Sequence, residues 1–229
     1  MQVGGFGGDH AGLGDQLLQQ GFDGRQQFLG DLCFAVRQLH AVAGPVQPGA
    51  AAGQLLRLQQ LVDEILDYAR LEAGQLPLQR QQIDLVELIS NVQEKLSPLP
   101  GAAIRLQLPA SALYFGDGHY LERAIQNLLV NAKKYARADI AVTLQFNARQ
   151  WQIIVDDDGP GIDLAWREKV LQPFYRLDAS RNKQAGGFGL GLAIVQRVMQ
   201  WHQGRVEIGT APQGGARFIL SLPAAPTIG

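Results

Sequence analysis

The sequence has one cysteine, Cys33, four scattered histidines and no long apolar run. A single cysteine excludes an internal disulfide and a multi-cysteine zinc site, and the histidines fit no metal-binding spacing. Because no apolar run could span a bilayer and the N-terminus lacks a basic start followed by an apolar stretch, we expect a cytoplasmic chain without a membrane segment. The net charge of −1 gives no reason to expect binding to nucleic acid.

Lysine and glutamate are absent from residues 1–57, and the first of each are Lys95 and Glu64. Residues 1–24 show no sustained hydrophobic period and are predicted to be disordered. Apolar residues at alternating spacings of three and four predict a helical hairpin over residues 25–74. A hairpin of this size has too small a core alone, so we expect it to dimerise as a four-helix bundle.

Residues 80–223 carry the patterns of a mixed domain. Their periodicities predict an α+β fold, a two-layer sandwich of helices on a mixed, mainly antiparallel sheet. Asp84 and Asp117 are expected to cap helices, the second of which runs over residues 118–136. Alternating apolar residues predict strands at 104–108 and 113–115 and two hairpins, at 140–155 and 206–222. Residues 75–82 are predicted to be a connector, and residues 164–171 a short helix.

Three polar residues share one face of the helix 118–136: Asn127, Asn131 and Lys134, at i, i+4 and i+7. Isolated asparagines on a helix are usually solvated surface residues. Here, however, the amide oxygens suit Mg²⁺, and the lysine could bind the phosphates that Mg²⁺ bridges. Tyr135, the next residue, could flank a base.

Two glycine-rich runs come next in the chain, Asp157-Asp158-Gly159-Pro160-Gly161 and Gly186-Gly187-Phe188-Gly189-Leu190-Gly191. A carboxylate beside glycines can accept a hydrogen bond from an exocyclic amine, although alone such a run is an ordinary acidic turn. The second run leads into an apolar helix, whose N-terminus favours phosphate. It has neither the dinucleotide-binding spacing nor the Gly-Lys-Ser/Thr of a P-loop.

Taken in order, these segments closely resemble the ATP-binding domain of sensor histidine kinases, a family of Bergerat-type ATPases together with gyrase and the chaperone ATPases. The resemblance covers about residues 58–223 and is most specific over 120–195. It implies the α+β fold of that ATPase domain, Mg²⁺ and ATP as cofactors, and a mobile lid over residues 163–188. It assigns Asn131 to Mg²⁺ and Asp157 to the adenine amine. The remaining nucleotide-binding residues that it implies are Asn127, Lys134, Tyr135, Gly159, Gly161, Phe174, Gly187, Gly189, Leu190 and Gly191.

Asn127 bears on whether the site hydrolyses ATP or transfers its phosphoryl group. In the family's ATP-hydrolysing relatives a glutamate precedes the metal-binding asparagine by one turn and activates water. An asparagine cannot act as that general base. We therefore expect ATP to be held for an external acceptor, with charge neutralisation by Mg²⁺, Lys134 and Arg176.

The phosphoryl acceptor is the point at which the sequence departs from the family. Phe34 falls where the family has its histidine, and Ala35 where it has the acidic partner. His40, five residues before Pro45, is the alternative acceptor, although a lone histidine near a helix end is more often structural. Either the kinase has lost its own acceptor, or residues 1–55 are not the native partner of the remaining chain, for example through a frameshift or a wrong start.

The sequence as a whole predicts the catalytic region of a two-component sensor histidine kinase. Such a region would transfer the γ-phosphoryl group of Mg-ATP to a histidine for relay to a response regulator, and would be cytoplasmic or the cytoplasmic part of an inner-membrane kinase. One alternative is an acceptor-less ATP-binding module that regulates a partner. A Ser/Thr kinase of the same ATPase class is a third, and it is disfavoured because such kinases need no hairpin.

Overall fold

The computed structural model describes residues 78–177 and 188–224, together with Val62, Glu64–Leu66, Tyr68, Ala69 and Leu71 of a preceding helix. The chain divides into two compact units, Met1–Gln54 and Leu55–Gly229, and every described residue belongs to the second. The predictions for residues 1–24, the first hairpin helix, His40 and Gly187 lie outside the described residues.

A five-stranded sheet has the order β2-β4-β5-β7-β6. Its strands are β2 (Ala103–Gln107), β4 (Asp139–Asn147), β5 (Gln150–Asp157), β6 (Arg205–Thr210) and β7 (Ala216–Pro223). Only β2 and β4 pair in parallel, and the other neighbours are antiparallel. The predicted mixed, mainly antiparallel sheet is therefore confirmed. Both long hairpins form where alternation predicted them.

A separate two-stranded ribbon pairs β1 (Gln81–Asp84) with β3 (Leu113–Gly116). The prediction that residues 75–82 are only a connector was wrong at its end, because β1 begins at Gln81. This strand is short, and its first two residues are exposed, so it lacks the alternation that reveals a half-buried strand. Its pairing with β3 is supplied by the fold rather than by local pattern.

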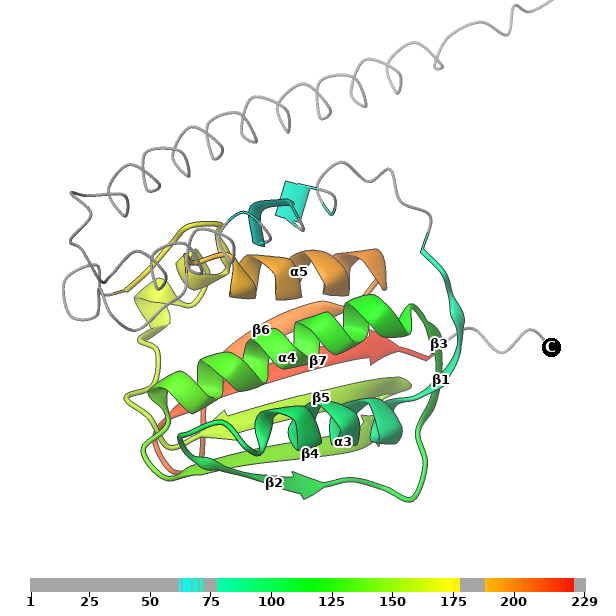
Figure 1. Cartoon of the computed structure of the whole chain (residues 1–229), viewed down its shortest axis with the longest axis horizontal. Helices are drawn as coiled ribbons and strands as arrows, with labels where there is room; N and C mark the ends of the chain where they lie inside the picture. Colours follow the sequence, from blue (N-terminus) through cyan, green and yellow to red (C-terminus); the bar gives the residue numbers. More distant parts are fainter. Residues whose placement is uncertain are drawn as a thin grey trace, which may run out of the picture. The chain divides into compact units, whose positions relative to one another are not determined.

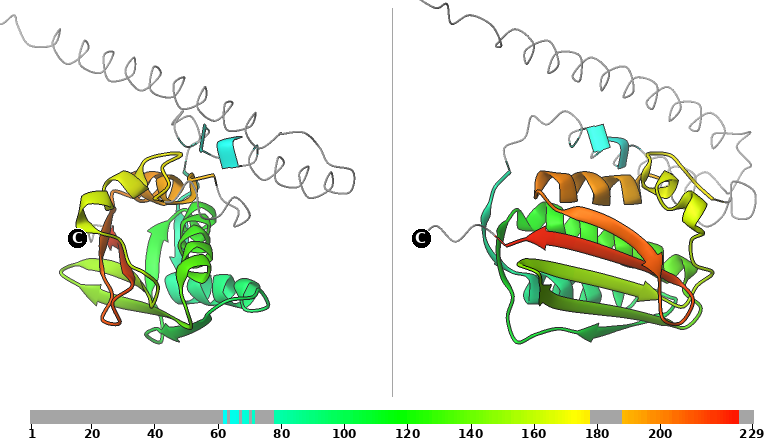
Figure 2. Two further views of the ribbon diagram at one scale, coloured as in Figure 1. Left: turned by 90° about the vertical axis from the view of Figure 1, so that its left-hand side faces the viewer. Right: turned by 180° about the vertical axis from the view of Figure 1, so that it is seen from behind.

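Three helices cover one face of the five-stranded sheet: α3 (Leu85–Leu96), α4 (Gly118–Tyr135) and α5 (Gly191–Trp201) (Figure 1). The end-on and rear views in Figure 2 show two layers, with the sheet on one side and the helices on the other. The α+β sandwich is thus confirmed. Both predicted caps form: Asp84 accepts a hydrogen bond from Val86 N–H, and Asp117 accepts from His119 and Tyr120 N–H.

The segment 164–171 is not one short helix as predicted. It contains two 3₁₀ turns, Leu164–Trp166 and Lys169–Leu171. The Arg167 side chain lies between them and donates to the carbonyl oxygens of Ile162 and Ile208 and to Thr210 Oγ1. These long-range bonds fix the backbone of a segment too short to propagate an α-helix.

The core lies between the helices and the sheet. The predicted apolar stripe of α4 is buried, at Leu121, Ala124, Leu128 and Ala132. Tyr68 and Leu71 of the preceding helix belong to the same core cluster, and Leu71 O accepts a hydrogen bond from Arg197 Nε. Within the described part of the chain, no helix is long and apolar enough to cross a membrane.

His202 connects the end of α5 to the start of α4. Its Nδ1 lies 2.8 Å from Val198 O, and its Nε2 accepts a hydrogen bond of 3.0 Å from Asp117 N–H. This pair of contacts requires the neutral Nδ1–H tautomer, since a protonated Nε2 could not accept. The ring is 3% exposed, and burial lowers the pKa of His202 below its ordinary value.

We therefore expect the free energy of unfolding to fall as the pH drops below about 6.5, the ordinary histidine pKa, because the unfolded chain then binds a proton that folded His202 does not. The loss should continue until the pH reaches the lowered pKa of the folded state. Urea unfolding as a function of pH measures it. His202→Leu should remove this contribution and, by leaving Asp117 N–H unpaired, cost about 1–3 kcal/mol near neutral pH.

His119, which is exposed on α4, provides the matched control: His119→Gln should retain the pH dependence that His202 contributes. The same slope below about pH 6.5 in wild type and His202→Leu would contradict this role for His202.

Candidate functional site

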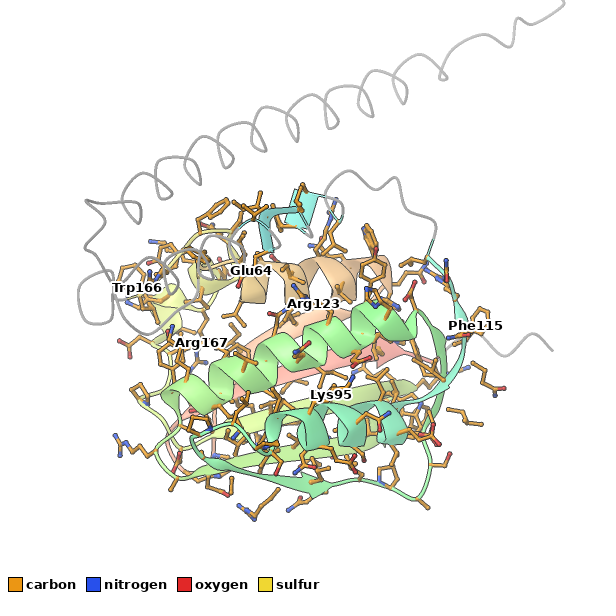
Figure 3. All side chains as sticks on the ribbon, viewed as in Figure 1. Glu64, Lys95, Phe115, Arg123, Trp166 and Arg167 are labelled. Atoms are coloured by element: carbon orange, nitrogen blue, oxygen red, sulfur yellow. The ribbon has the colours of Figure 1, made fainter. Side chains whose placement is uncertain are left out.

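Four segments meet at one end of the helix-covered sheet: the C-terminal half of α4, the loop after β5, the N-terminus of α5 and the β6–β7 turn. α4 and α5 pack side by side in opposite directions, with the start of α5 beside Asn127 in the middle of α4 (Figure 1). Figure 3 marks this end with Trp166 and Arg167, and the opposite end with Phe115. Most of the predicted site residues lie on these segments.

Asp157, the last residue of β5, is 3% exposed and has no cationic side chain bound to it among the described residues. Its Oδ1 accepts two backbone hydrogen bonds, from Gly159 N–H at 2.8 Å and from Ala216 N–H at 3.1 Å. Amide donors of this kind stabilise a buried carboxylate. Within the described residues, both bonds use Oδ1, which leaves Oδ2 to accept from a ligand amine.

The carboxylates on either side of Asp157 have other partners. Asp156 accepts two hydrogen bonds of 2.7 Å from Nε and Nη2 of Arg217 on β7, and this bonding raises the pKa of Arg217. Asp158 accepts from the backbone of Arg137 and Ala138. The run of three aspartates therefore contains one residue available to a ligand and two that hold its surroundings.

On α4, Asn127 faces the start of α5. Its Nδ2 is buried without a hydrogen-bond partner among the described residues, and a Cβ on Gly191 would lie 3.2 Å from its Oδ1. A buried unpaired amide is costly unless a ligand or water satisfies it. Asn131 is half-buried one turn later, and Lys134 Nζ lies 5.1 Å from the ring centre of Tyr135.

The start of α5 offers further donors. Leu190 is the N-cap and makes no side-chain capping hydrogen bond, because a leucine side chain has no acceptor atom. This side chain is fully buried. The first amides of the helix thus lack a side-chain cap, as at anion-binding helix N-termini. Gly189, in front of it, has φ +80°, and its carbonyl oxygen accepts a hydrogen bond of 2.9 Å from Phe174 N–H.

The glycines of the loop after β5 allow close backbone contact. A Cβ on Gly159 would lie 2.6 Å from Tyr135 O, so no other residue fits where this loop meets the end of α4. Gly161 has φ +73° and packs against the Gly214 backbone. The glycines predicted as nucleotide-binding residues thus also join the loop to α4 and to the β6–β7 turn.

The segment before the second glycine run contributes an aromatic cluster. Trp166 and Tyr175 stack with ring centres 6.3 Å apart, and Lys169 Nζ lies 4.7 Å from the Trp166 ring centre. Phe174 has φ +63° and packs against the core, and Arg176 is exposed.

Sequence reasoning missed the β6–β7 turn as part of the site. A Cβ on Gly215 would lie 2.0 Å from Asp157 O, and Ala216 N–H is one of the two donors to Asp157. The pair Gly214-Gly215 was predicted only as a hairpin turn. The sequence could have indicated this role through the Gly214-Gly215 pair, which directly precedes a strand predicted to join the same sheet as the strand that ends in Asp157.

Comparisons with known proteins place this arrangement in a family. Residues 116–226 match the family described as histidine kinase-, DNA gyrase B-, and HSP90-like ATPase. The sensor protein RstB of Escherichia coli (strain K12) is 37% identical over 169 residues, which are 73% of this chain and 39% of RstB.

Solved structures of histidine kinases also resemble this chain. The histidine kinase domain of the E. coli osmosensor EnvZ is 34% identical, with a TM-score of 0.51, and the match covers 68% of this chain and 95% of that domain. The chain belongs to the sensor histidine kinase family. Full-length ShkA in complex with AMPPNP is 25% identical, with a TM-score of 0.67, over 93% of this chain and 46% of ShkA.

Membership of the histidine kinase family confirms the resemblance drawn from the sequence and makes the domain an ATP-binding one. The chain spans about two fifths of the length of RstB. The roles of the individual site residues remain predictions. The structure places Asn127 beside Gly191 and Asp157 beside Gly159, and it bonds Gly189 to Phe174. Within the described residues no group of three His, Cys, Asp or Glu side chains could hold a metal ion.

Gly215→Ala tests whether the turn supports Asp157. The added methyl group would collide with the Asp157 backbone, so we expect a loss of about 1–3 kcal/mol in the free energy of unfolding and weaker ATP binding. Gly209→Ala, in the neighbouring strand β6, is the matched control, because its Cβ would meet nothing closer than 3.8 Å. Thermal denaturation of both variants measures the difference in stability. Equal stability of the two variants would contradict the close contact between Gly215 and the Asp157 backbone.

Proposed function

We propose that this chain binds Mg-ATP between α4, the loop 157–161 and the start of α5. The observation that carries the proposal is the buried Asp157 carboxylate, whose Oδ1 is held by two backbone amides. A carboxylate oxygen presented in this way accepts from the exocyclic amine of adenine. The complex of ShkA with AMPPNP supports a nucleotide on this fold.

The phosphate end of the proposed site is the region of Asn127, Asn131, Lys134 and the α5 N-terminus. Mg²⁺, when bound, would neutralise phosphate charge. Asn131 would supply an amide oxygen to it, and Lys134 a positive charge. Asn127 has an unpaired Nδ2–H for a phosphate oxygen or a water molecule. Gly189, Gly191 and, from the sequence, Gly187 would contact the phosphates through their backbone amides.

We further propose that the chain is the catalytic region of a two-component kinase. The γ-phosphoryl group would pass to a histidine and then to the aspartate of a response regulator. Asn127 favours transfer over hydrolysis, because an amide cannot deprotonate water. Positioning and charge neutralisation would then supply the catalysis, with Arg176 as a further cation. Dimerisation through the hairpin 25–74 and His40 as the acceptor belong to the same proposal.

Asp157→Asn tests the adenine contact. The carboxamide would place an N–H₂ donor where the adenine amine needs an acceptor, and we expect ATP affinity to fall at least about tenfold, a free-energy change of about 1.4 kcal/mol. Calorimetric titration with ATP measures it. Glu207→Gln on the edge strand β6 is the control, since Glu207 is exposed and pairs with Arg205. An Asp157→Asn variant with wild-type affinity would contradict the assignment.

Asn131→Ala tests the metal contact separately. We expect it to remove most of the gain in ATP affinity that Mg²⁺ gives over a solution containing EDTA. Val130→Ala, at the exposed neighbouring position, should retain that gain. Titration of both variants with and without Mg²⁺ decides, and an unchanged Mg²⁺ effect in Asn131→Ala would remove this residue from the metal site.

Incubation of the full chain with γ-labelled ATP tests the transfer step. We expect an acid-labile, base-stable label, as phosphohistidine gives, and its loss in His40→Gln if His40 is the acceptor. Label that persists in His40→Gln would place the acceptor elsewhere. ATP binding without label would contradict self-phosphorylation and favour the acceptor-less module that regulates a partner.

A further inference from the structure

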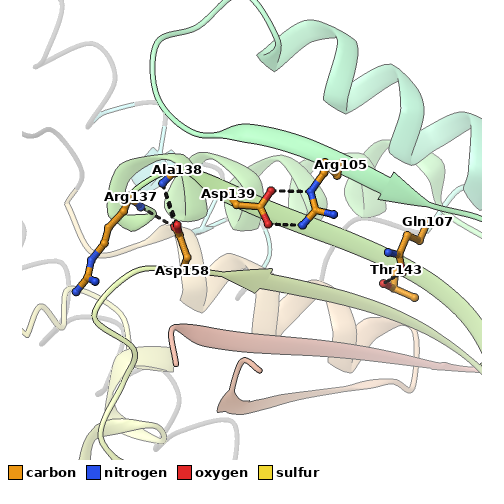
Figure 4. Close-up of polar contacts among 7 residues, drawn as sticks. All are labelled: Arg105, Gln107, Arg137, Ala138, Asp139, Thr143 and Asp158. Atoms are coloured by element: carbon orange, nitrogen blue, oxygen red, sulfur yellow. Dashed lines mark hydrogen bonds and ion pairs between the residues drawn. The ribbon is translucent and has the colours of Figure 1, made fainter. Parts of the chain in front are cut away.

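Asp158 is bonded to the chain segment that leaves α4. Its Oδ1 accepts a hydrogen bond of 2.7 Å from Arg137 N–H, and its Oδ2 accepts one of 3.0 Å from Ala138 N–H (Figure 4). These are the two residues after Ala136, the C-cap at which α4 ends in an extended conformation. One side chain on the β5 loop therefore holds the turn between α4 and β4.

A second contact joins the same two segments. Gly159, the residue after Asp158, packs so closely that its Cβ would lie 2.6 Å from Tyr135 O, the last carbonyl of α4. The end of α4 is thus fixed by Asp158 on its outgoing backbone and by Gly159 on its final turn. That final turn carries Asn131, Lys134 and Tyr135, while the residue before Asp158 is Asp157.

The charge on Asp158 strengthens the connection. Burial opposes ionisation, but the backbone amides of Ala138 and Arg137 outweigh it and lower the pKa of Asp158 below its ordinary value. Hydrogen bonds from amides to an ionised carboxylate are stronger than neutral ones. Nearby Asp139 differs, because its carboxylate pairs with Arg105 of β2 and bonds to Gln213 of the β6–β7 turn, and not to the backbone that leaves α4 (Figure 4).

We propose that Asp158 is a positioning residue that sets the phosphate end of the nucleotide site, on α4, relative to its adenine end at Asp157. This inference rests on the proposed Mg-ATP site. Asp158 touches backbone rather than ligand, so its effect passes through the placement of Asn131 and Lys134. A nucleotide spans both ends, and a small displacement of one end against the other reduces the contacts it can make simultaneously.

Asp158→Ala in the full chain tests this role, with ATP affinity measured by calorimetry in Mg²⁺ and in EDTA. We expect affinity in Mg²⁺ to fall at least about tenfold and affinity in EDTA to change much less, because Asp157 keeps its own amide donors. Asp158→Asn retains one oxygen acceptor and should give an intermediate value. Glu207→Ala, which removes an exposed carboxylate paired with Arg205 on β6, is the matched control and should bind as wild type does.

The outcomes separate the inference from the function on which it rests. If the wild type does not bind ATP, both are overturned. If the wild type binds and Asp158→Ala binds equally well in Mg²⁺, the positioning role alone is overturned. An equal loss with and without Mg²⁺ would show that Asp158 only supports the loop. If Asp158→Ala does not fold, Asp158→Asn is compared with Glu207→Ala by the same measurements.

Discussion

The site depends on a buried carboxylate that, among the residues the structure describes, is stabilised by backbone amides rather than by a cation. Asp157 is almost fully enclosed, and its Oδ1 accepts from the amides of Gly159 and Ala216. An ionised group at this depth is tolerable only if such donors are fixed in place. The Gly214–Gly215 turn, the Asp156–Arg217 pair and the contact of Gly159 with α4 each hold part of that arrangement.

The same constraint explains why glycine is concentrated at one end of the sheet. Around Asp157 the backbones of α4, β5 and β7 approach more closely than side chains would allow, as at Gly159 and Gly215. At the opposite end, the corresponding link between helices is made by a side chain, His202, which joins α5 to the start of α4. Close backbone contact occurs at that end too, because a Cβ on Gly204 would lie 2.4 Å from Ser221 O. The end with Asp157 differs in leaving donors and acceptors for a ligand.

Much of the fold could be predicted because its elements are long and periodic. The caps at Asp84 and Asp117, the buried stripe of α4 and both hairpins follow from local pattern. The strand β1 and the 3₁₀ turns at 164–171 could not, since pairing with β3 and the bonds of Arg167 come from residues distant in sequence. For the site, motif order predicted roles for Asn127, Asp157 and Gly191. It could not separate the roles of three consecutive aspartates, which depend on strand neighbours.

The central claim is that the chain recognises adenine through Asp157. Calorimetric titration of the full chain with Mg-ATP and Mg-GTP tests it most directly, because guanine presents a carbonyl oxygen where adenine presents its amine. We expect measurable ATP binding, and GTP binding weaker by at least about a hundredfold, since the buried Asp157 carboxylate would face the carbonyl oxygen of guanine, which is also an acceptor. Equal affinity for the two nucleotides, or no binding of ATP, would contradict it.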